Sequence, residues 1–232
     1  MFDYKSNLNV TSLFPTAVAT LDCPLDNSVA VELFEKCELH NFTSKQTTEY
    51  GDLSKNTYIL DNYKCKELNN WIIEAVECFS REVLGLKAST YIFLQSWVTV
   101  KYPQQHHKPH THPNSIVSGV FYWQTHDIEP INFFKGNYYH QSSFMVNTEK
   151  PTIYNNKMHS VSPRPNSIVL FPSNLQHSVA VNTTNIPRKS LAFNTIPLEG
   201  LGEAGFLTEI DFHRIALKNT NSNLKLLKKF SK

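Results

Sequence analysis

The spacing of apolar residues changes about a third of the way along the chain. Before that point, two segments repeat apolar side chains every three to four positions, which is the period of a helix. Residues 65–84 place Leu68, Ile72 and Val76 on one face, and residues 27–37 show the same period over a shorter length. The pattern therefore predicts two amphipathic helices.

From Tyr91 onward the sequence consists of short runs rich in β-branched and aromatic residues, separated by Pro, Asn, Gly and Ser. Such runs are typical of strands that alternate between two faces of a sheet. The pattern indicates an antiparallel sandwich or barrel. The seven runs are YIFLQSWVTVKY, SIVSGVFYWQ, PINFF, PTIYN, NSIVLFPS, HSVAVN and KSLAFNTI.

The composition is that of one packed globule. With 232 residues, of which 41% are hydrophobic and 12% aromatic, the chain can bury one sizeable core. Its 22 basic and 20 acidic side chains nearly cancel to a formal charge of +2. This balance gives no general electrostatic reason to expect nucleic acid or an anionic membrane as a partner.

The cysteines and the N-terminal residues indicate the cellular compartment. Four cysteines, with no CxxC pair among them, argue against a zinc ribbon or a redox motif. The N-terminal residues show no basic start followed by an apolar run, and no segment approaches the roughly 18 apolar residues of a membrane span. We therefore expect a cytoplasmic protein with free thiols, in the host cytoplasm if a phage encodes it.

Histidines form the most informative cluster. Four of the ten lie between residues 106 and 112, and histidine is the commonest metal ligand. On an extended segment His110 and His112 project to the same face, so both can bind one ion. His177, which opens the run HSVAVN, offers a third ligand from a distant strand.

A second pair of residues suggests how an anion would be bound. Arg188 and Ser190 project from the same face of a predicted strand, eleven residues after His177. A guanidinium with a neighbouring hydroxyl is suited to binding a carboxylate through two parallel hydrogen bonds. The sequence therefore combines a candidate metal site with a candidate carboxylate site.

The segments HTHPNSIVSGVFYW, NSIVLFPSNLQHSV and RKSLAFN carry a family resemblance. Their order, a histidine pair, a distal histidine and then Arg-x-Ser, resembles the iron(II)- and 2-oxoglutarate-dependent oxygenases. More narrowly, it is similar to the small bacterial and phage oxygenases related to prolyl hydroxylases. The resemblance covers nearly the whole chain, and its specific part is residues 97–194.

The resemblance implies a mainly β fold, the double-stranded β-helix or jelly roll, with flanking N-terminal α-helices. It implies a single domain over residues 1–232, divided into an N-terminal helical flanking region (1–88), the jelly-roll core (89–198) and a C-terminal extension (199–232).

The resemblance also implies a chemistry. Fe(II) would be held by His110, His112 and His177, and 2-oxoglutarate by Arg188 and Ser190. With O2, the enzyme would release succinate and CO2 and hydroxylate an unidentified prime substrate, a peptide or a small molecule.

One position departs from the family pattern. The usual second ligand is Asp or Glu, and here His112 stands in its place, which would leave the metal one negative charge short. Asp127 or Glu129 is an alternative source of a carboxylate. We expect His106 and His107 to be solvated or at the rim of the site.

The sequence also predicts roles for three further groups of residues. Trp97, Tyr122 and Asn194 flank the predicted site, and core packing is the expected role of the first two. Residues 135–165 are long and polar enough to form a lid or substrate loop. We expect the lysine-rich residues 224–232 to form a solvated or packed helix.

Two other functions fit the same architecture. One is a cupin-like three-histidine metalloenzyme that binds its substrate directly and does not use 2-oxoglutarate. The other is a non-enzymatic jelly-roll binding module of phage origin. Succinate formation separates the first prediction from both, and the sequence pattern specifies neither the prime substrate nor an oligomeric state.

Overall fold

The computed structural model describes residues 9–40, 51–87, 90–125, 130–135 and 149–216. Both predicted helices are confirmed, and a π-helical turn extends the second one. The helical elements are α2 (Ser28–Glu35), η2 (Ile59–Asp61), η3 (Tyr63–Cys65), α3 (Lys66–Cys78), η4 (Phe79–Val83) and η5 (Ala204–Phe206).

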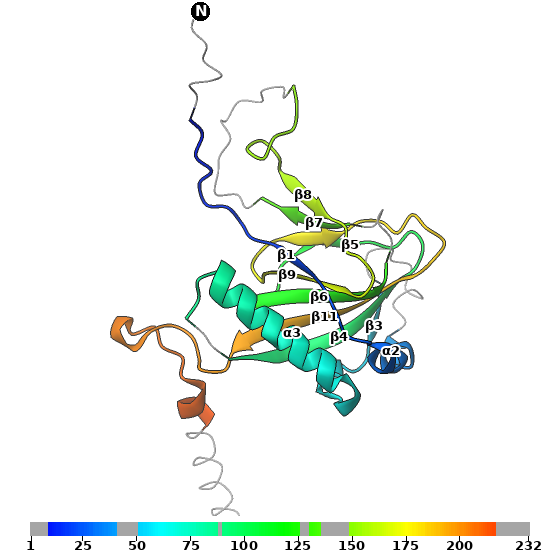
Figure 1. Cartoon of the computed structure of the whole chain (residues 1–232), viewed down its shortest axis with the longest axis horizontal. Helices are drawn as coiled ribbons and strands as arrows, with labels where there is room; N and C mark the ends of the chain where they lie inside the picture. The colour runs from blue at the N-terminus through cyan, green and yellow to red at the C-terminus, as the bar shows by residue number, and fades with distance from the viewer. Residues whose placement is uncertain (1–8, 41–50, 88–89, 126–129, 136–148, 217–232) are drawn as a thin grey trace, which may run out of the picture.

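The strands form two antiparallel sheets, shown in Figure 1. The larger sheet has the order β1 (Ala19–Asp22), β9 (Ser167–Pro172), β6 (Val117–Gln124), β11 (Arg188–Pro197), β4 (Tyr91–Lys101), β3 (Asp52–Ser54) and β2 (Leu39–His40). The smaller sheet has the order β5 (His107–His110), β10 (His177–Val179), β7 (Ile131–Phe134) and β8 (Met158–Val161). The prediction of a mainly β jelly-roll architecture is confirmed.

The larger sheet is buried on both faces. Helix α3 lies across one face in Figure 1, and its buried residues pack with Ile168, Leu170 and neighbouring side chains of that face. Val169 and Phe171 of the same strand point to the other side, where they pack against Ile131 of the smaller sheet. Because alternate residues of β9 serve different clusters, the strand reads as one continuous apolar run.

Two expectations about the elements were wrong in detail. The run PTIYN forms a turn, and the strand of that region is β8, which follows it. The Asn155 side chain accepts a hydrogen bond from the backbone N–H of Thr152 (2.7 Å), and bonds of this kind compete with strand pairing. In addition, the region predicted as a helical flank contributes β1, β2 and β3 to the larger sheet.

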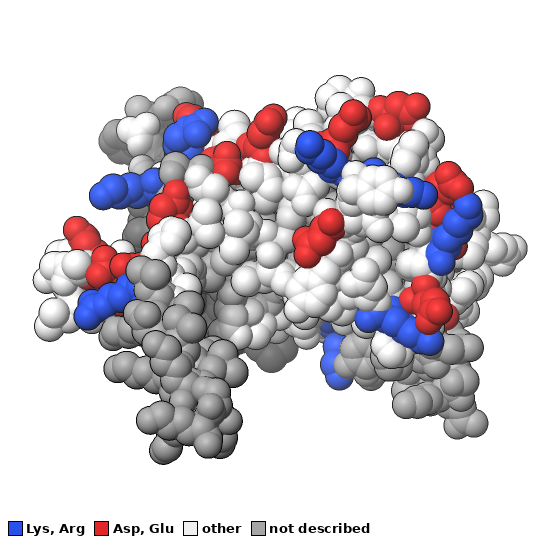
Figure 2. Space-filling view, turned by 90° about the horizontal axis from the view of Figure 1, so that it is seen from below, with Lys and Arg blue, Asp and Glu red and all other residues white. Residues whose placement is uncertain are grey.

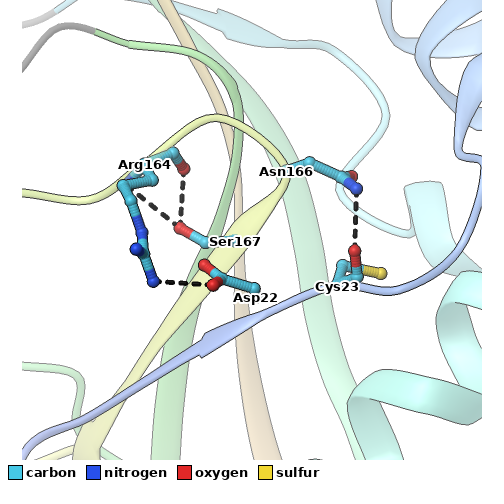
Figure 3. A network of polar contacts seen from close by, with 5 residues as sticks. All are labelled: Asp22, Cys23, Arg164, Asn166 and Ser167. Carbon is cyan, nitrogen blue, oxygen red and sulfur yellow. Dashed lines mark hydrogen bonds and ion pairs between the residues drawn. The ribbon is translucent and has the colours of Figure 1, made fainter.

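A polar network fixes the edge strand β1 to the turn before β9 (Figure 3). Asn166 adopts a left-handed conformation (φ 57°), and its side-chain amide donates to the carbonyl of Cys23 (2.8 Å). Arg164 donates to the Asp22 carboxylate (2.6 Å), and Ser167 donates to the Arg164 carbonyl (2.6 Å). These bonds set the register of β1 against β9, in which Asp22 pairs with Ser167.

The charged side chains in Figure 2 are of both signs and are interspersed over the face shown. This distribution agrees with the small net charge and with the absence of an electrostatic argument for a nucleic-acid partner. Within the described residues, none of the helices has the length and apolar character needed to cross a membrane. Residues 224–232 lie outside the described residues, so their predicted helix stays a prediction.

The packing around Gly119 generates a stability prediction. A Cβ at this position of β6 would lie 2.4 Å from Phe193 Cζ and 2.7 Å from Leu170 Cδ2. We expect Gly119→Ala to lower the free energy of unfolding by about 1–3 kcal/mol in urea denaturation. Gly205→Ala is the control, because a Cβ there meets no atom within 4 Å. Equal losses in both variants would contradict this account.

Candidate metal centre

The structure brings the three predicted histidine ligands together. Strand β5 ends at His110, His112 follows two residues later, and β10 begins at His177. His110 and His177 are direct partners in the pairing of β5 with β10. Their side-chain nitrogens and that of His112 all lie within 4.8 Å of one another, so the group can hold one metal ion. That these residues bind a metal stays a prediction.

Two of the three imidazoles are oriented by backbone carbonyls. Nδ1 of His110 donates to the Lys108 carbonyl (3.0 Å), and Nδ1 of His177 donates to the Leu175 carbonyl (2.9 Å). Because a carbonyl only accepts, Nδ1 carries the proton and the neutral ring keeps its lone pair on Nε2. This is the outer-shell arrangement that prepares histidine as a metal ligand.

The cluster also favours the neutral form of its imidazoles. Burial, reinforced by the neighbouring His110, lowers the pKa of His112 to about 4 and that of His177 to about 3. Burial lowers the pKa of His110 as well. Metal ions bind the neutral imidazole, so no proton has to be displaced at neutral pH.

A buried hydroxyl network holds the loop that carries His112. The backbone N–H of His112 donates to the Ser173 carbonyl (2.9 Å). The Ser173 hydroxyl bonds to the hydroxyls of Ser115 (2.8 Å) and Ser118 (2.7 Å), and Ser118 donates to the side chain of Asn194 (2.8 Å). Asn194, predicted to flank the site, thus supports the loop from behind.

The expectation for His107 needs correction, because this residue lines the cavity beside the three histidines. Its ring stacks on that of His110, with centroids 4.2 Å apart and planes at 24°. Burial is the main cause that lowers the pKa of His107, to about 2. The pairing of β5 with β10, in which Val179 faces His107, draws the residue inward.

The floor of the cavity is formed by paired residues of β4 and β11. Alternate side chains of the two strands face the histidines, and three pairs follow one another along the floor: Trp97 with Ala192, Thr99 with Ser190, and Lys101 with Arg188. Successive pairs are about 6.8 Å apart along the strands. The Trp97 end lies next to the histidines, since its ring centroid is 6.0 Å from that of His112.

Arg188 lies at the far end of this floor and is 3% exposed. Its guanidinium carbon is 4.9 Å from the centre of the Tyr122 ring, and its buried Nη1 has no hydrogen-bond partner among the described residues. An unpaired donor of this kind is costly unless a ligand satisfies it. A carboxylate entering the cavity would supply the missing acceptor.

The sequence interpretation overlooked Lys101 and misjudged Trp97. Trp97 lines the cavity and belongs to neither described core cluster, so packing is not its main role. Lys101 also lines the cavity and is 4% exposed. The signal for both was present, because residues 97, 99 and 101 alternate on one strand and must face the same side.

The remaining candidates have different positions. His159 is exposed on β8 and takes no part in the cluster, and Tyr122 both lines the cavity and packs in the inter-sheet core. Asp127 and Glu129 lie outside the described residues, as do residues 136–148 of the predicted lid.

One segment of the chain matches a known family model. Residues 95–194 match the model described as putative 2OG-Fe(II) oxygenase, a segment that contains the three histidines, Arg188 and Ser190. No curated protein is similar enough in sequence to count as a relative.

Solved structures share the fold at low sequence identity. A prolyl-4-hydroxylase from Pseudomonas putida is 17% identical, with a TM-score of 0.51 over 77% of this chain and 92% of that chain. HygX from Streptomyces hygroscopicus, solved with nickel, 2-oxoglutarate and hygromycin B, is 11% identical, with a TM-score of 0.53 over 78% and 83%. The epimerase SnoN, described as non-heme and alpha-ketoglutarate-dependent, is 12% identical, with a TM-score of 0.56 over 79% and 80%.

The fold and the family match define a jelly-roll protein with a histidine cluster between its sheets. Over residues 95–194 the chain is similar to the 2OG-Fe(II) oxygenases, and the solved structures share its fold.

The depressed pKa values generate a prediction for the metal-free protein. The unfolded chain protonates these imidazoles near the ordinary pKa of 6.5, whereas His112 and His177 resist protonation down to about 4 and 3 in the folded state. Their contribution to stability is complete above pH 6.5 and is lost as the pH falls below it. We expect the free energy of unfolding, measured with a chelator present, to fall as the pH is lowered from 6.5 to about 3.

The matched variants are His112→Gln with His177→Gln, which should make this pH dependence shallower. His159→Gln, which changes an exposed histidine outside the cluster, should leave it as in the parent. The same slope in the parent and in the double variant would show that the buried imidazoles do not cause it.

Proposed function

We propose that the protein is an Fe(II)- and 2-oxoglutarate-dependent hydroxylase acting on a peptide or small-molecule prime substrate. The observation that supports this proposal best is the position of the histidine cluster and Arg188 at two ends of one cavity. A metal site alone fits many enzymes. A metal site that shares its cavity with a buried guanidinium, whose Nη1 has no hydrogen-bond partner among the described residues, fits a ligand that is both a chelator and a carboxylate.

The donor set suits Fe(II). His110, His112 and His177 would bind through neutral imidazole nitrogens, and three ligands leave further positions for a cosubstrate and oxygen. With no carboxylate among the three, the ion would keep its full charge and act as a stronger Lewis acid. When bound, Fe(II) supplies the chemistry that couples conversion of 2-oxoglutarate and O2 to succinate and CO2 with hydroxylation of the prime substrate.

The cavity residues would orient the cosubstrate. Arg188 would donate two parallel hydrogen bonds to the distal carboxylate, and Ser190, the next residue on the same face, would add a third. The apolar walls, which include Val120 and Ile131, would lower the local dielectric constant and so strengthen each of these bonds. These contacts with the distal carboxylate would thus hold the 2-oxo acid end of the ligand at the metal.

Iron binding is the first test. We expect the metal-free protein to take up one Fe(II) per chain and to develop a visible charge-transfer band when 2-oxoglutarate is added without oxygen. His110→Ala and His177→Ala should abolish both, and His112→Asp should retain them because a carboxylate replaces the imidazole. His159→Ala is the control. Normal iron uptake by His112→Ala would instead point to another ligand, such as Asp127.

The role of Arg188 is tested separately. Arg188→Ala should keep its iron and weaken 2-oxoglutarate binding by about 2–5 kcal/mol, or roughly thirtyfold to several thousandfold. Arg188→Lys should recover part of the affinity, because an ammonium cannot form the two-pronged contact. Lys189→Ala is the matched control, since Lys189 pairs with Glu35 on the outer side (2.5 Å). Equal dissociation constants in parent and Arg188→Ala would remove the cosubstrate assignment.

A further inference from the structure

Lys101 places a second buried cation at the Arg188 end of the cavity. The two residues are direct partners in the pairing of β4 with β11, and both side chains line the same cavity. Lys101 is 4% exposed and Arg188 is 3% exposed. None of the described residues that line the cavity is acidic.

The polar groups of this pair are poorly satisfied by the protein. Among the described residues, the Lys101 ammonium donates to the His106 carbonyl alone, at 3.5 Å, which is the long limit of a hydrogen bond. Neither cation forms an ion pair within the described part of the chain. Burial, and secondly the charge of Arg188, lower the pKa of Lys101 to about 7. Two buried like charges destabilise each other, and an anion bound between them would offset this repulsion.

The order of side chains along the floor determines how a bound anion would be oriented in the cavity. The cations lie at one end, the hydroxyls of Thr99 and Ser190 follow, and Trp97 with the histidines lies at the other end. A ligand that chelates a metal with its 2-oxo acid group would therefore direct its tail toward the cations. A tail ending in a carboxylate is favoured there, and an apolar tail is not.

We propose that Lys101 and Arg188 bind the same tail carboxylate, so that Lys101 makes the cavity selective for 2-oxo dicarboxylic acids over 2-oxo monocarboxylic acids. This inference rests on the proposed function. It assigns Lys101 as a specificity-determining residue that contacts the cosubstrate, in addition to the Arg-x-Ser pair.

The test compares two ligands in matched variants of the iron-loaded protein without oxygen. Dissociation constants for 2-oxoglutarate and 2-oxobutyrate, which lacks the tail carboxylate, are measured by titrating the charge-transfer band. Lys101→Met should weaken 2-oxoglutarate binding by about 10- to 100-fold, the effect of losing one charge-assisted hydrogen bond. Binding of 2-oxobutyrate should stay the same or tighten, because its apolar tail no longer faces an ammonium.

Two further variants complete the comparison. Lys101→Arg should retain the preference for 2-oxoglutarate, because it keeps the positive charge. Lys189→Met should leave both dissociation constants unchanged, since its side chain faces Glu35 outside the cavity. Lys101→Gln keeps a polar side chain and provides the same measurement if the Met variant does not fold.

The outcomes separate the two proposals. If the parent gives no band with either 2-oxo acid, the proposed function fails. If the parent gives the band and Lys101→Met or Lys101→Gln weakens both ligands equally, or neither, the role of Lys101 is wrong. A lysine that pairs with an acid of the chain itself would lower the free energy of unfolding when replaced and leave both dissociation constants unchanged.

Discussion

The pairing of β5 with β10 is the contact on which the rest of the site depends. It sets His177 directly opposite His110, although 67 residues separate them in the sequence, and it draws His107 into the cavity. The Lys108 carbonyl within β5 and the Leu175 carbonyl just before β10 fix the proton on Nδ1 of His110 and His177. A slip of one residue would turn the histidines away from the cavity. The smaller sheet therefore acts as the template of the metal centre.

The larger sheet imposes the complementary constraint. Strands β4 and β11 lie inside a sheet packed on both faces, and Thr99, Lys101, Arg188 and Ser190 on their inner face are buried. Placing Lys101 and Arg188 there costs free energy that a purely apolar floor would not. Such a cost is typical of functional sites, because residues placed there for binding often lower the stability of the fold. The folded protein therefore has two buried cations positioned to bind an anion.

Much of the fold could be predicted from the sequence, for identifiable reasons. The helix at residues 66–78 has strong apolar periodicity, and strands β4, β9 and β11 are runs rich in β-branched and aromatic residues. The HTH spacing brought His110 and His112 to one site. The turn at Thr152–Asn155 was missed because side-chain hydrogen bonds, not apolar pattern, decide it. The inward position of His107 depends on the pairing of β5 with the distant strand β10, which a single sequence does not display.

The central claim is that one cavity holds iron at its histidine end and a carboxylate at its cationic end. Anomalous diffraction at the iron edge, from crystals grown without oxygen in Fe(II) and 2-oxoglutarate, tests it most directly. We expect one iron peak bound by His110, His112 and His177, with 2-oxoglutarate chelating it and its far carboxylate against Arg188. An iron peak at other residues, or 2-oxoglutarate bound away from Arg188, would contradict the account.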